Sequence, residues 1–536
     1  MSTSPLVARP RFAALLPLAL ALALAPAARA QDELLSIEGQ QFGAQLGGAA
    51  GIAALGDVDD DKIPDFAVGE RLWDGKAGAD CGRVALFSGK SRKEIRSWEG
   101  EYAGDELGTI VRNVRDIDGD QVDDLAIVSP AWPKATWQGK VEIWSGKRGT
   151  RLYTFTGEAP GDRLEQVCGV GDVTGDGVND LVTSAIGWNK APNGRGTGRV
   201  YLHSGKDGAP WRSYDGRLPG AEFGWRLAAL DFDSDTDGLN DFIATSLESG
   251  IKPPEGGRIE YFSANWPYSI AGRISLTPGD ELAYVTDAAD VDGDGDGDLL
   301  FSAPNWQGHG GAWLYSTYIF SPLLLSWTGT AELPIEGDAT LAGDVDGDGY
   351  LDLAFRFPSF DRPAAADVGM VQIVSGEHGR ELTRLVGTTP GGGFGSGGLA
   401  NGGNLDGDKK HLPDLLVGTP GHDTASSFDV GRVQAFGGND LYLTLSHEVA
   451  YVNDTVDVAT TGGVPGNPVV TAVITIDGFP TWIQLLAIVP FDPFGELIVH
   501  PMIAPDWVPF DLELQSFAIG ANGKLVSSSV RRLELR

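Results

Sequence analysis

The residues best suited to chemistry in this chain are aspartates spaced two apart in short, glycine-rich loops. The clearest copy runs from Asp344 to Asp352 (DVDGDGYLD), with carboxylates at positions 1, 3, 5 and 9 and an apolar segment directly after it. At an effective dielectric constant near 20, each pair of like charges about 4 Å apart costs roughly 4 kcal/mol. Oxygen ligands at alternate positions of a flexible loop suit Ca²⁺, which takes about 6–8 of them. The pattern therefore predicts a calcium site.

This acidic loop occurs seven times, with loop starts roughly 54–61 residues apart. That interval fits a four-stranded antiparallel unit. Two copies depart from the pattern, because Thr174 replaces an aspartate in the third loop and the seventh loop begins with Asn404 and is stretched by two residues. We expect weaker or empty sites in those two. Asp231 competes with Asp233 as the first position of the fourth loop. The predicted metal ligands are Asp57, Asp59, Asp61 and Asp65; Asp116, Asp118, Asp120 and Asp124; Asp172, Asp176 and Asp180; Asp233, Asp235, Asp237 and Asp241; Asp290, Asp292, Asp294 and Asp298; Asp344, Asp346, Asp348 and Asp352; and Asn404, Asp406, Asp408 and Asp414.

Other short motifs recur in phase with the acidic loops. A residue–glycine step precedes several loops, and a third, alternating strand that opens with glycine and a cation follows them, as at 82–89, 139–146, 198–205 and 431–437. The steps before the loops are Phe42-Gly43, Leu107-Gly108, Phe223-Gly224 and Phe394-Gly395, and strand ends after the loops include Ser129-Pro130, Ser302-Ala303-Pro304 and Gly418-Thr419-Pro420.

Together these features resemble the FG-GAP repeats of integrin α-subunit β-propellers, over roughly residues 32–440. The resemblance implies an all-β chain with a seven-bladed β-propeller. It also implies that the aspartates named above are calcium ligands, with the backbone carbonyl at loop position 7 as a further ligand. An EF-hand is excluded, because position 12 of these loops falls inside an apolar strand instead of supplying a glutamate.

The two ends of the chain depart from the repeat. Arg9 and Arg11, the apolar run 12–25 and Ala28-Arg29-Ala30 predict a cleaved signal peptide over residues 1–30, and hence an exported protein that is secreted, periplasmic or on the cell surface. Residues 34–39 match the fourth strand of a repeat that lacks its first three, so we expect this strand to close the last blade of a propeller spanning 31–440. Short strands separated by Gly- and Pro-rich turns predict a C-terminal β-sandwich at 441–536.

The formal net charge of −34 argues against nucleic acid or an anionic membrane as a partner. After the signal peptide, no stretch is long and apolar enough to span a membrane. Cys81 and Cys168 lie in different repeats, so they either pair or remain two solitary buried thiols.

One further position recurs, eight residues beyond the last aspartate of each loop. It is aromatic in most copies, and we call its aromatic and histidine members the collar: Trp73, Trp132, Trp188, Trp306, Phe360 and His422. In a propeller these residues share the face opposite the acidic loops, and Trp137 lies in the same segment of its blade. Either the collar binds a ligand by stacking, or each member packs against the neighbouring blade and braces its own long loop. Repetition favours packing, whereas exposure would favour binding.

No catalytic signature is present, because the chain lacks H-E-x-x-H, G-x-S-x-G and phosphate-loop motifs. We therefore expect a non-catalytic binding or adhesion module whose partner is an extracellular protein or polysaccharide. The alternatives are a propeller hydrolase or lyase acting on polysaccharide, since propellers host many chemistries, and a structural component of the cell surface.

Overall fold

The computed structural model describes residues 33–437 except 49, 191–194, 231–238, 248–256, 264–270, 275–283, 286–288, 294–296, 305, 317–322, 332, 338, 363–364, 380, 408–411 and 425–426. Beyond residue 437 it describes the backbone of the strands alone. The predicted signal peptide lies outside these residues. In the part of the chain that is described, the regular structure is β apart from one short 3₁₀ turn, η1 (Trp306–Gly308).

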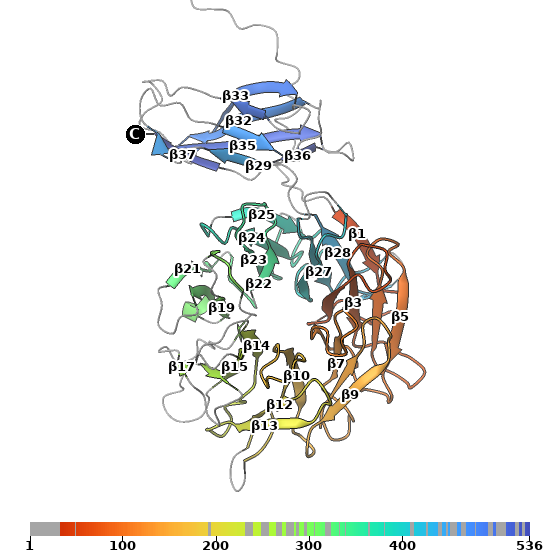
Figure 1. The fold of residues 1–536 in the computed structure, drawn as a ribbon. Helices are drawn as coiled ribbons and strands as arrows, with labels where there is room; N and C mark the ends of the chain where they lie inside the picture. Colours follow the sequence, from red (N-terminus) through yellow and green to blue (C-terminus); the bar gives the residue numbers. More distant parts are fainter. Residues whose placement is uncertain are drawn as a thin grey trace, which may run out of the picture.

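Seven four-stranded antiparallel sheets are arranged as blades around a ring (Figure 1). The predicted seven-bladed β-propeller is confirmed. In order from the innermost to the outermost strand, the blades are β2 (Ile52–Gly56), β3 (Asp65–Glu70), β4 (Arg83–Phe87) and β5 (Glu94–Glu99); β6 (Ile110–Asn113), β7 (Leu125–Ser129), β8 (Lys140–Trp144) and β9 (Arg151–Thr156); β10 (Leu164–Gly169), β11 (Leu181–Ala185), β12 (Arg199–His203) and β13 (Pro210–Asp215); β14 (Leu227–Leu230), β15 (Asp241–Ser246), β16 (Arg258–Phe262) and β17 (Ala271–Ile274); β18 (Tyr284–Val285), β19 (Asp298–Ala303), β20 (Gly311–Ser316) and β21 (Leu323–Thr328); β22 (Thr340–Gly343), β23 (Asp352–Phe357), β24 (Met370–Val374) and β25 (Glu381–Val386); and β26 (Leu399–Asn401), β27 (Leu415–Thr419), β28 (Arg432–Phe436) and β1 (Glu33–Glu38).

The seventh blade joins the two ends of the ring. Strand β1 pairs antiparallel with β28, with Glu38 opposite Arg432, and the side chains of these two residues form an ion pair at 2.9 Å. Pairing covers the edge of β28, which would otherwise present open backbone donors and acceptors to solvent.

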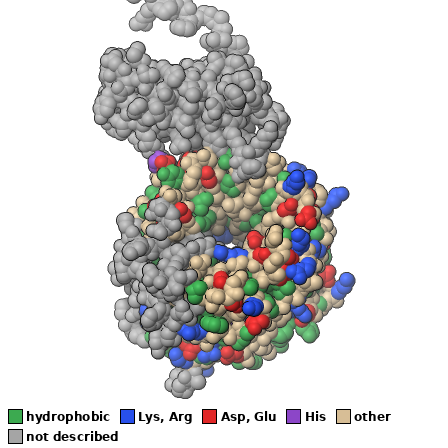
Figure 2. Space-filling view, viewed as in Figure 1, with side chains coloured by type: hydrophobic (Ala, Val, Ile, Leu, Met, Phe, Trp, Pro, Cys, Tyr) green, Lys and Arg blue, Asp and Glu red, His purple; other side chains and the backbone are tan. Residues whose placement is uncertain are grey.

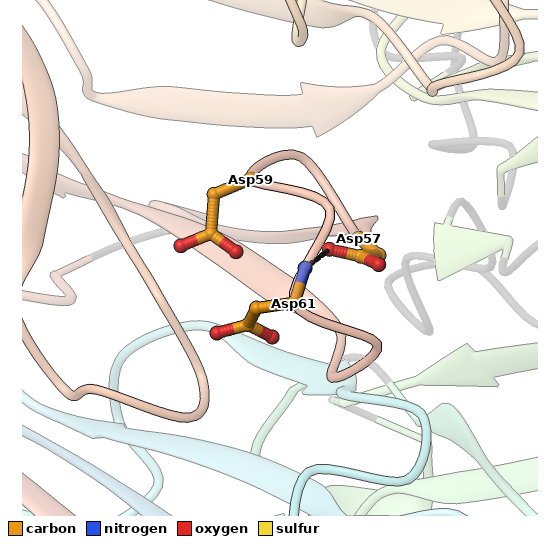
Figure 3. A group of neighbouring side chains, drawn as sticks. All are labelled: Asp57, Asp59 and Asp61. Atoms are coloured by element: carbon orange, nitrogen blue, oxygen red, sulfur yellow. Dashed lines mark hydrogen bonds between the residues drawn. The ribbon is translucent and has the colours of Figure 1, made fainter.

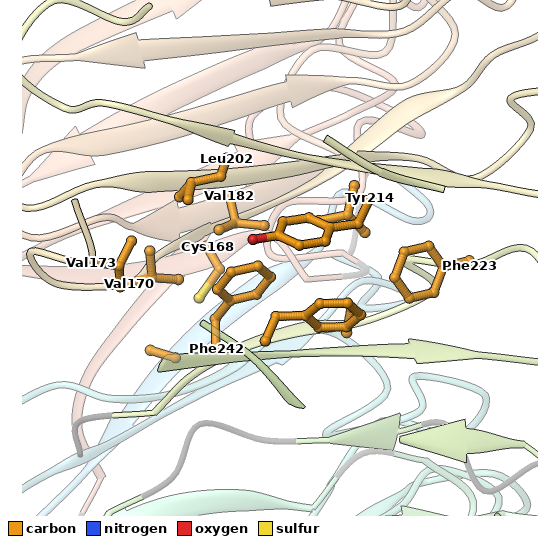
Figure 4. Close-up of a cluster of buried hydrophobic side chains, with 12 residues drawn as sticks. Cys168, Val170, Val173, Val182, Leu202, Tyr214, Phe223 and Phe242 are labelled. Carbon is orange, nitrogen blue, oxygen red and sulfur yellow. The ribbon is translucent and has the colours of Figure 1, made fainter. Parts of the chain in front are cut away.

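The hydrophobic core lies between the blades. The second strands β3, β7, β11, β15 and β19 are buried along their whole length, whereas the outer strands β5 and β9 are exposed or partly buried at every residue except Trp98. Between the third and fourth blades, Tyr214, Phe242 and Phe262 pack with ring centroids 4.7–5.7 Å apart (Figure 4). Each second strand therefore contributes apolar side chains to both of its faces, as sheets stacked on both sides require.

Because the strands alternate in direction, each end of the ring carries two kinds of connection. The acidic loops, which join first to second strands, share one end with the connections between third and fourth strands. The opposite end, which we call the loop face, carries the connections from second to third strands and from each fourth strand to the next blade. Backbone hydrogen bonds join these two sets, as from Leu107 N–H to Cys81 O at 3.1 Å and from Phe394 N–H to Val368 O at 3.0 Å.

The structure corrects the residue–glycine step of the first blade. Leu46-Gly47, and not Phe42-Gly43, occupies the position of Leu107-Gly108 and Phe394-Gly395, because Leu46 is buried and its N–H bonds Val430 O at 3.1 Å. Gly47 has φ of 74°, and a Cβ there would lie 2.6 Å from Val433 Cγ2, whereas a Cβ at Gly43 would meet nothing within 4 Å. Both glycines have a positive φ, 72° at Gly43 and 74° at Gly47, but only at Gly47 does the lack of space also require glycine.

Beyond the propeller the chain forms two further sheets (Figure 1). Two strands were not expected from the sequence, β30 and β37, which pair with each other in parallel. The first is only two residues long, and the second begins with two arginines, so neither gives a clear apolar alternation. One sheet contains β29 (Tyr442–Leu445), β31 (Val458–Thr461) and β34 (Leu497–Val499); the other contains β30 (Val449–Ala450), β37 (Arg531–Leu535), β35 (Asp511–Ile519), β32 (Pro468–Ile476), β33 (Phe479–Pro490) and β36 (Leu525–Ser527).

Within the described residues, no helix has the length and apolar character needed to cross a membrane. Cys81 and Cys168 are both buried and form no disulfide. Of the two interpretations open from the sequence, the structure therefore supports two separate thiols.

Candidate metal centres and loop face

Four acidic loops bring three carboxylates together at one end of the ring. In the first loop, between β2 and β3, one oxygen each of Asp57, Asp59 and Asp61 lies within 4.8 Å of the others (Figure 3). The same distance holds in three further groups, which are Asp116, Asp118 and Asp124; Asp290, Asp292 and Asp298; and Asp344, Asp346 and Asp348. All these residues belong to the predicted ligand set.

The other predicted ligands are placed as follows. The third loop is described in full, and its Asp172, Asp176 and Asp180 do not form such a group; Thr174 Oγ1 lies 3.4 Å from Asp180 Oδ1. In the fourth and seventh loops, Asp241 opens β15 and Asp414 lies directly before β27, and both are buried. Asn404 and Asp406 lie in the seventh loop. Asp233, Asp235, Asp237, Asp294 and Asp408 fall outside the described residues.

The aspartate at position 9 of the loop connects separate segments of its blade by hydrogen bonds. Asp65 is fully buried, and its carboxylate accepts hydrogen bonds from Val58 N–H (2.8 Å), Asp59 N–H (3.2 Å) and Gly89 N–H (3.0 Å). Asp124 repeats this arrangement with Ile117, Asp118 and Gly146. Because Gly89 lies in the turn between the third and fourth strands, the carboxylate joins the acidic loop to the far side of its own blade. Such charge-assisted bonds are worth about 1.5–3 kcal/mol each.

The first aspartate of the loop fixes its turn. Asp344 Oδ1 accepts from Gly347 N–H (2.6 Å) and Asp348 N–H (3.0 Å), and its Oδ2 accepts from Gly349 N–H at 3.0 Å. At position 5, Asp348 Oδ1 accepts from Tyr350 N–H at 2.9 Å. The backbone therefore holds the carboxylates in place from outside the cluster, as in turns built by aspartate side chains.

Burial disfavours the charged form of the aspartates at position 9. Burial raises the pKa of Asp65 to about 6 and that of Asp124 to about 7. The pKa of Asp352 rises to about 9, first through burial and then through the charge of Asp346. A group of hard oxygen donors whose charges repel one another fits a divalent cation such as Ca²⁺ or Mg²⁺.

An arginine from the turn between β8 and β9 pairs with the carboxylates of the second loop. The guanidinium of Arg148 lies 2.6 Å from Asp118 Oδ1 and 3.2 Å from Asp120 Oδ2. Although burial raises the pKa of Asp120, the bonds from Arg148 and Val122 N–H hold it below its ordinary value. Sequence reasoning missed this residue, although it stands two positions after the glycine that binds Asp124.

At the loop face, the collar residues lie against cations at the start of the third strand. Arg83 lies over Trp73 with 4.9 Å to the ring centroid, Lys140 over Trp132 at 5.4 Å and Arg199 over Trp188 at 3.7 Å.

The other three collar residues also have partners. Phe360 packs against the core between the fifth and sixth blades, and Trp306 contacts Trp313 edge-on at 5.2 Å. His422 is buried, 2.6 Å from the guanidinium of Arg432. These contacts favour the packing interpretation of the collar, because stacked cations cover its rings.

Different aromatic side chains are exposed at this face. They belong to the connections between strands: Phe42 (68% exposed), Tyr102 (58%), Trp137 (47%) and Phe428 (64%). Gly43 N–H bonds Phe428 O at 3.1 Å, which places Phe42 and Phe428 on adjoining segments. Sequence reasoning assigned Phe42 to the repeat motif instead, although its neighbour Leu46-Gly47 was the available alternative.

Trp137 stands in an unusual backbone conformation. Its φ is 51°, in the left-handed region. Asp80, Asp367 and Asp429 make the equivalent backbone hydrogen bonds in other blades and share this conformation. Bulky residues are rare in this region, whereas aspartate tolerates it. The fold thus holds a large, exposed indole where a small polar residue would suit the backbone better.

Comparison with known proteins shows which proteins the repeats resemble. The profile described as "FG-GAP repeat" matches residues 337–374. The chain is 34% identical over 179 residues to phosphatidylinositol-glycan-specific phospholipase D of Rattus norvegicus, covering 29% of this chain and 20% of that protein. It is 26% identical over 207 residues to integrin alpha-V of Gallus gallus (35% and 19%) and 25% identical over 154 residues to integrin alpha-4 of Xenopus laevis (27% and 14%).

The matched segment therefore spans a fifth or less of the length of these relatives. Among solved structures, a fungal alcohol oxidase of the AA5 family in complex with copper aligns with 94% of this chain and 99% of its own, at 10% identity and a TM-score of 0.42, which is too low to support any inference. The profile match, the integrin similarity and the seven blades agree with one another. Through its propeller, the chain is similar to the FG-GAP, integrin alpha-like family.

Proposed function

We propose that this protein is an exported, calcium-stabilised propeller that acts as a non-catalytic binding or adhesion module, with an extracellular protein or polysaccharide as its ligand. In this proposal residues 1–30 are a signal peptide, 31–440 form the propeller and 441–536 form an accessory domain. The acidic loops hold the ions at one end of the ring, and the loop face presents the ligand-binding residues at the other.

The exposed aromatic side chains of the loop face carry the proposal. Phe42, Tyr102, Trp137 and Phe428 all come from connections at this end, and each is at least 47% exposed. Exposed aromatic rings stack on sugar rings and fill apolar pockets of protein partners. The collar residues lie in connections at the same end, where cations cover three of their rings. The binding residues we propose are thus the exposed set, with the collar as its base.

Calcium gives the loop face a fixed frame. The ions would be held by the predicted aspartates, foremost the four groups of three carboxylates, and would cancel their mutual repulsion. Extracellular calcium modules bind with dissociation constants of about 10⁻⁴–10⁻³ M, so stability would follow the calcium level of the medium.

The test is retention of the purified protein on a panel of polysaccharides and matrix proteins in 5 mM calcium. A Trp137→Ser/Phe428→Ser double variant is compared with Trp211→Ser, which removes a 55%-exposed indole from the outer strand β13. We expect the double variant to lose retention at least tenfold and the Trp211 variant to match the parent. Equal retention of all three proteins would refute the role of this surface.

The similarity to a phospholipase D keeps an enzyme as the second candidate. That similarity covers 20% of the relative, so its activity passes to this chain only as a hypothesis. Released product, measured in the same wells with glycan and with glycolipid substrates, would establish a hydrolase or lyase and refute the non-catalytic proposal. Ordered self-assembly without retention on any surface would instead indicate a structural component.

A further inference from the structure

A cavity of about 360 Å³ opens at the centre of the ring, where the first strands begin. Its walls come from several blades: Thr109, Ile110 and Arg112 of the second, Gln166 of the third, Arg226 of the fourth, and Glu336, Arg356 and Pro358 of the sixth. Because residues just before the first strands and just after a second strand line it, the cavity lies at the loop-face end of the channel. Figure 2 shows the ring hollowed at its centre, with Lys or Arg side chains beside the hollow.

The charge of this cavity is opposite to that of the protein. Three arginines are among the residues that line it, Arg112, Arg226 and Arg356, against one acidic residue, Glu336. Glu165, the neighbour of Gln166, also interacts with Arg226, and burial raises its pKa. The lining therefore remains positive in a chain whose formal net charge is −34.

The arginines are fixed to the backbone of the ring. Arg356 Nη1 donates to Gly397 O at 3.0 Å, and Arg226 Nη1 donates to Trp225 O at 3.0 Å. Arg226 also stacks on the indole of Trp225, 5.3 Å from its centroid. Side chains held in this way lose little conformational entropy on binding a ligand, and planar guanidinium groups match carboxylate, sulfate and phosphate oxygens.

We propose that the channel mouth binds the oxyanion group of a small molecule: a phosphate, sulfate or carboxylate, free or carried by a single sugar unit. The volume fits a ligand of that size, at the lower end of the range of small-molecule pockets, about 300–1,000 Å³. Arg112, Arg226 and Arg356 contact the oxyanion, and the side-chain amide of Gln166 offers a further hydrogen bond. The site rests on residues that are separate from both the acidic loops and the exposed aromatic set.

The test is calorimetric titration of the purified protein in calcium-containing buffer at constant ionic strength. The probes are sodium sulfate, inorganic phosphate, glucuronate and glucose 6-phosphate, with glucose as the neutral control. We expect saturable binding of at least one anion and none of glucose. Tighter binding of the sugar anions than of the inorganic ions would identify a sugar-borne oxyanion, and the reverse would identify a free one. No saturable binding of any anion would overturn the proposal.

Some variants should weaken anion binding and another should tighten it. A folding defect could not produce both results. Arg112→Gln and Arg356→Gln should each weaken binding about tenfold, whereas Glu336→Gln, which removes the opposing charge at constant volume, should tighten it about threefold. Arg384→Gln, on the outer strand β25, is the matched control and should leave the affinity unchanged. Affinity that is unaffected in all four variants would place the anion elsewhere and refute the assignment.

Discussion

Replacing Asp346 by asparagine should have opposite effects on stability with and without calcium. Asp346 is 2% exposed and shares its loop with the carboxylates of Asp344 and Asp348, all within 4.8 Å. At that distance and a dielectric constant near 20, each ionised pair costs about 3.5 kcal/mol, so the substitution removes roughly 7 kcal/mol of gross repulsion. The protein can lower this cost by taking up a proton on one of these carboxyls. The neighbouring Asp352 shows the same tendency, since burial and the charge of Asp346 raise its pKa to about 9.

Protonation limits the benefit of the substitution. Keeping a carboxyl with an ordinary pKa near 4 protonated at pH 7.5 costs about 5 kcal/mol, so Asp346→Asn should stabilise the calcium-free protein by about 2–5 kcal/mol. With an unfolding entropy near 2.1 cal/mol/K per residue over roughly 400 residues, that range raises Tm by about 2–6 °C. In calcium the same substitution removes an ion ligand, and Tm should fall by a similar amount.

The assay is differential scanning calorimetry of the parent and variant in 5 mM calcium and in 5 mM EDTA. Asp60→Asn is the control, because that side chain belongs to an acidic loop yet is 78% exposed, and its Tm should change by less than about 1 °C in either buffer. A Tm for Asp346→Asn that is lower by the same amount in both buffers would refute the reasoning, since it would make the carboxylate a structural hydrogen-bond acceptor.

Two further predictions concern a competing cation and a buried histidine. Removing the guanidinium that pairs with Asp118 and Asp120, by Arg148→Ala, should tighten ion binding in the second loop about two- to fivefold, because this exposed cation competes weakly with the ion for the same two carboxylates. Terbium luminescence sensitised by Trp144, and abolished in Trp144→Phe, reports on this loop. An unchanged affinity would contradict the competition. Burial lowers the pKa of His203 to about 4, below its unfolded value near 6.5, so its contribution to stability is present above pH 6.5 and is lost at up to about 1.4 kcal/mol per pH unit as the pH falls toward 4. His203→Gln should flatten this part of the profile in denaturant unfolding at pH 7, 6 and 5, whereas parallel profiles would show that His203 is not the titrating group.

The sequence was sufficient for the blade count because the acidic loop is a local, periodic signal. Each of the first six copies places its carboxylates within nine residues, so their grouping in the first and sixth loops needs no knowledge of the rest of the fold. The role of the aspartate at position 9 could be predicted only in part from the sequence. Its bond to Gly89, 24 residues away, depends on the hairpin between the third and fourth strands.

The aromatic residues of the loop face show where local reading fails. In the segment QFGAQLGG, two residue–glycine steps lie four residues apart. They are distinguished by contacts with the other end of the chain, where Leu46 bonds Val430 and Gly47 lies against Val433. Likewise, the collar tryptophans pair with cations that follow at different intervals, 10 residues for Trp73 and 8 for Trp132. No fixed spacing could therefore reveal that these rings are covered.

The channel arginines lie beyond sequence reasoning for a related reason, and they also change how the net charge should be understood. Arg112 lies within β6, Arg226 just before β14 and Arg356 within β23, so they occupy unrelated repeat positions and meet only because the ring closes. Strand β6 carries Arg112 near the loop face and leads into Asp116 at the other end. The same short strands therefore separate positive from negative charge along the ring axis. An anionic ligand is repelled by the acidic end and attracted at the channel mouth, so a protein with net charge −34 still offers anions one favourable approach.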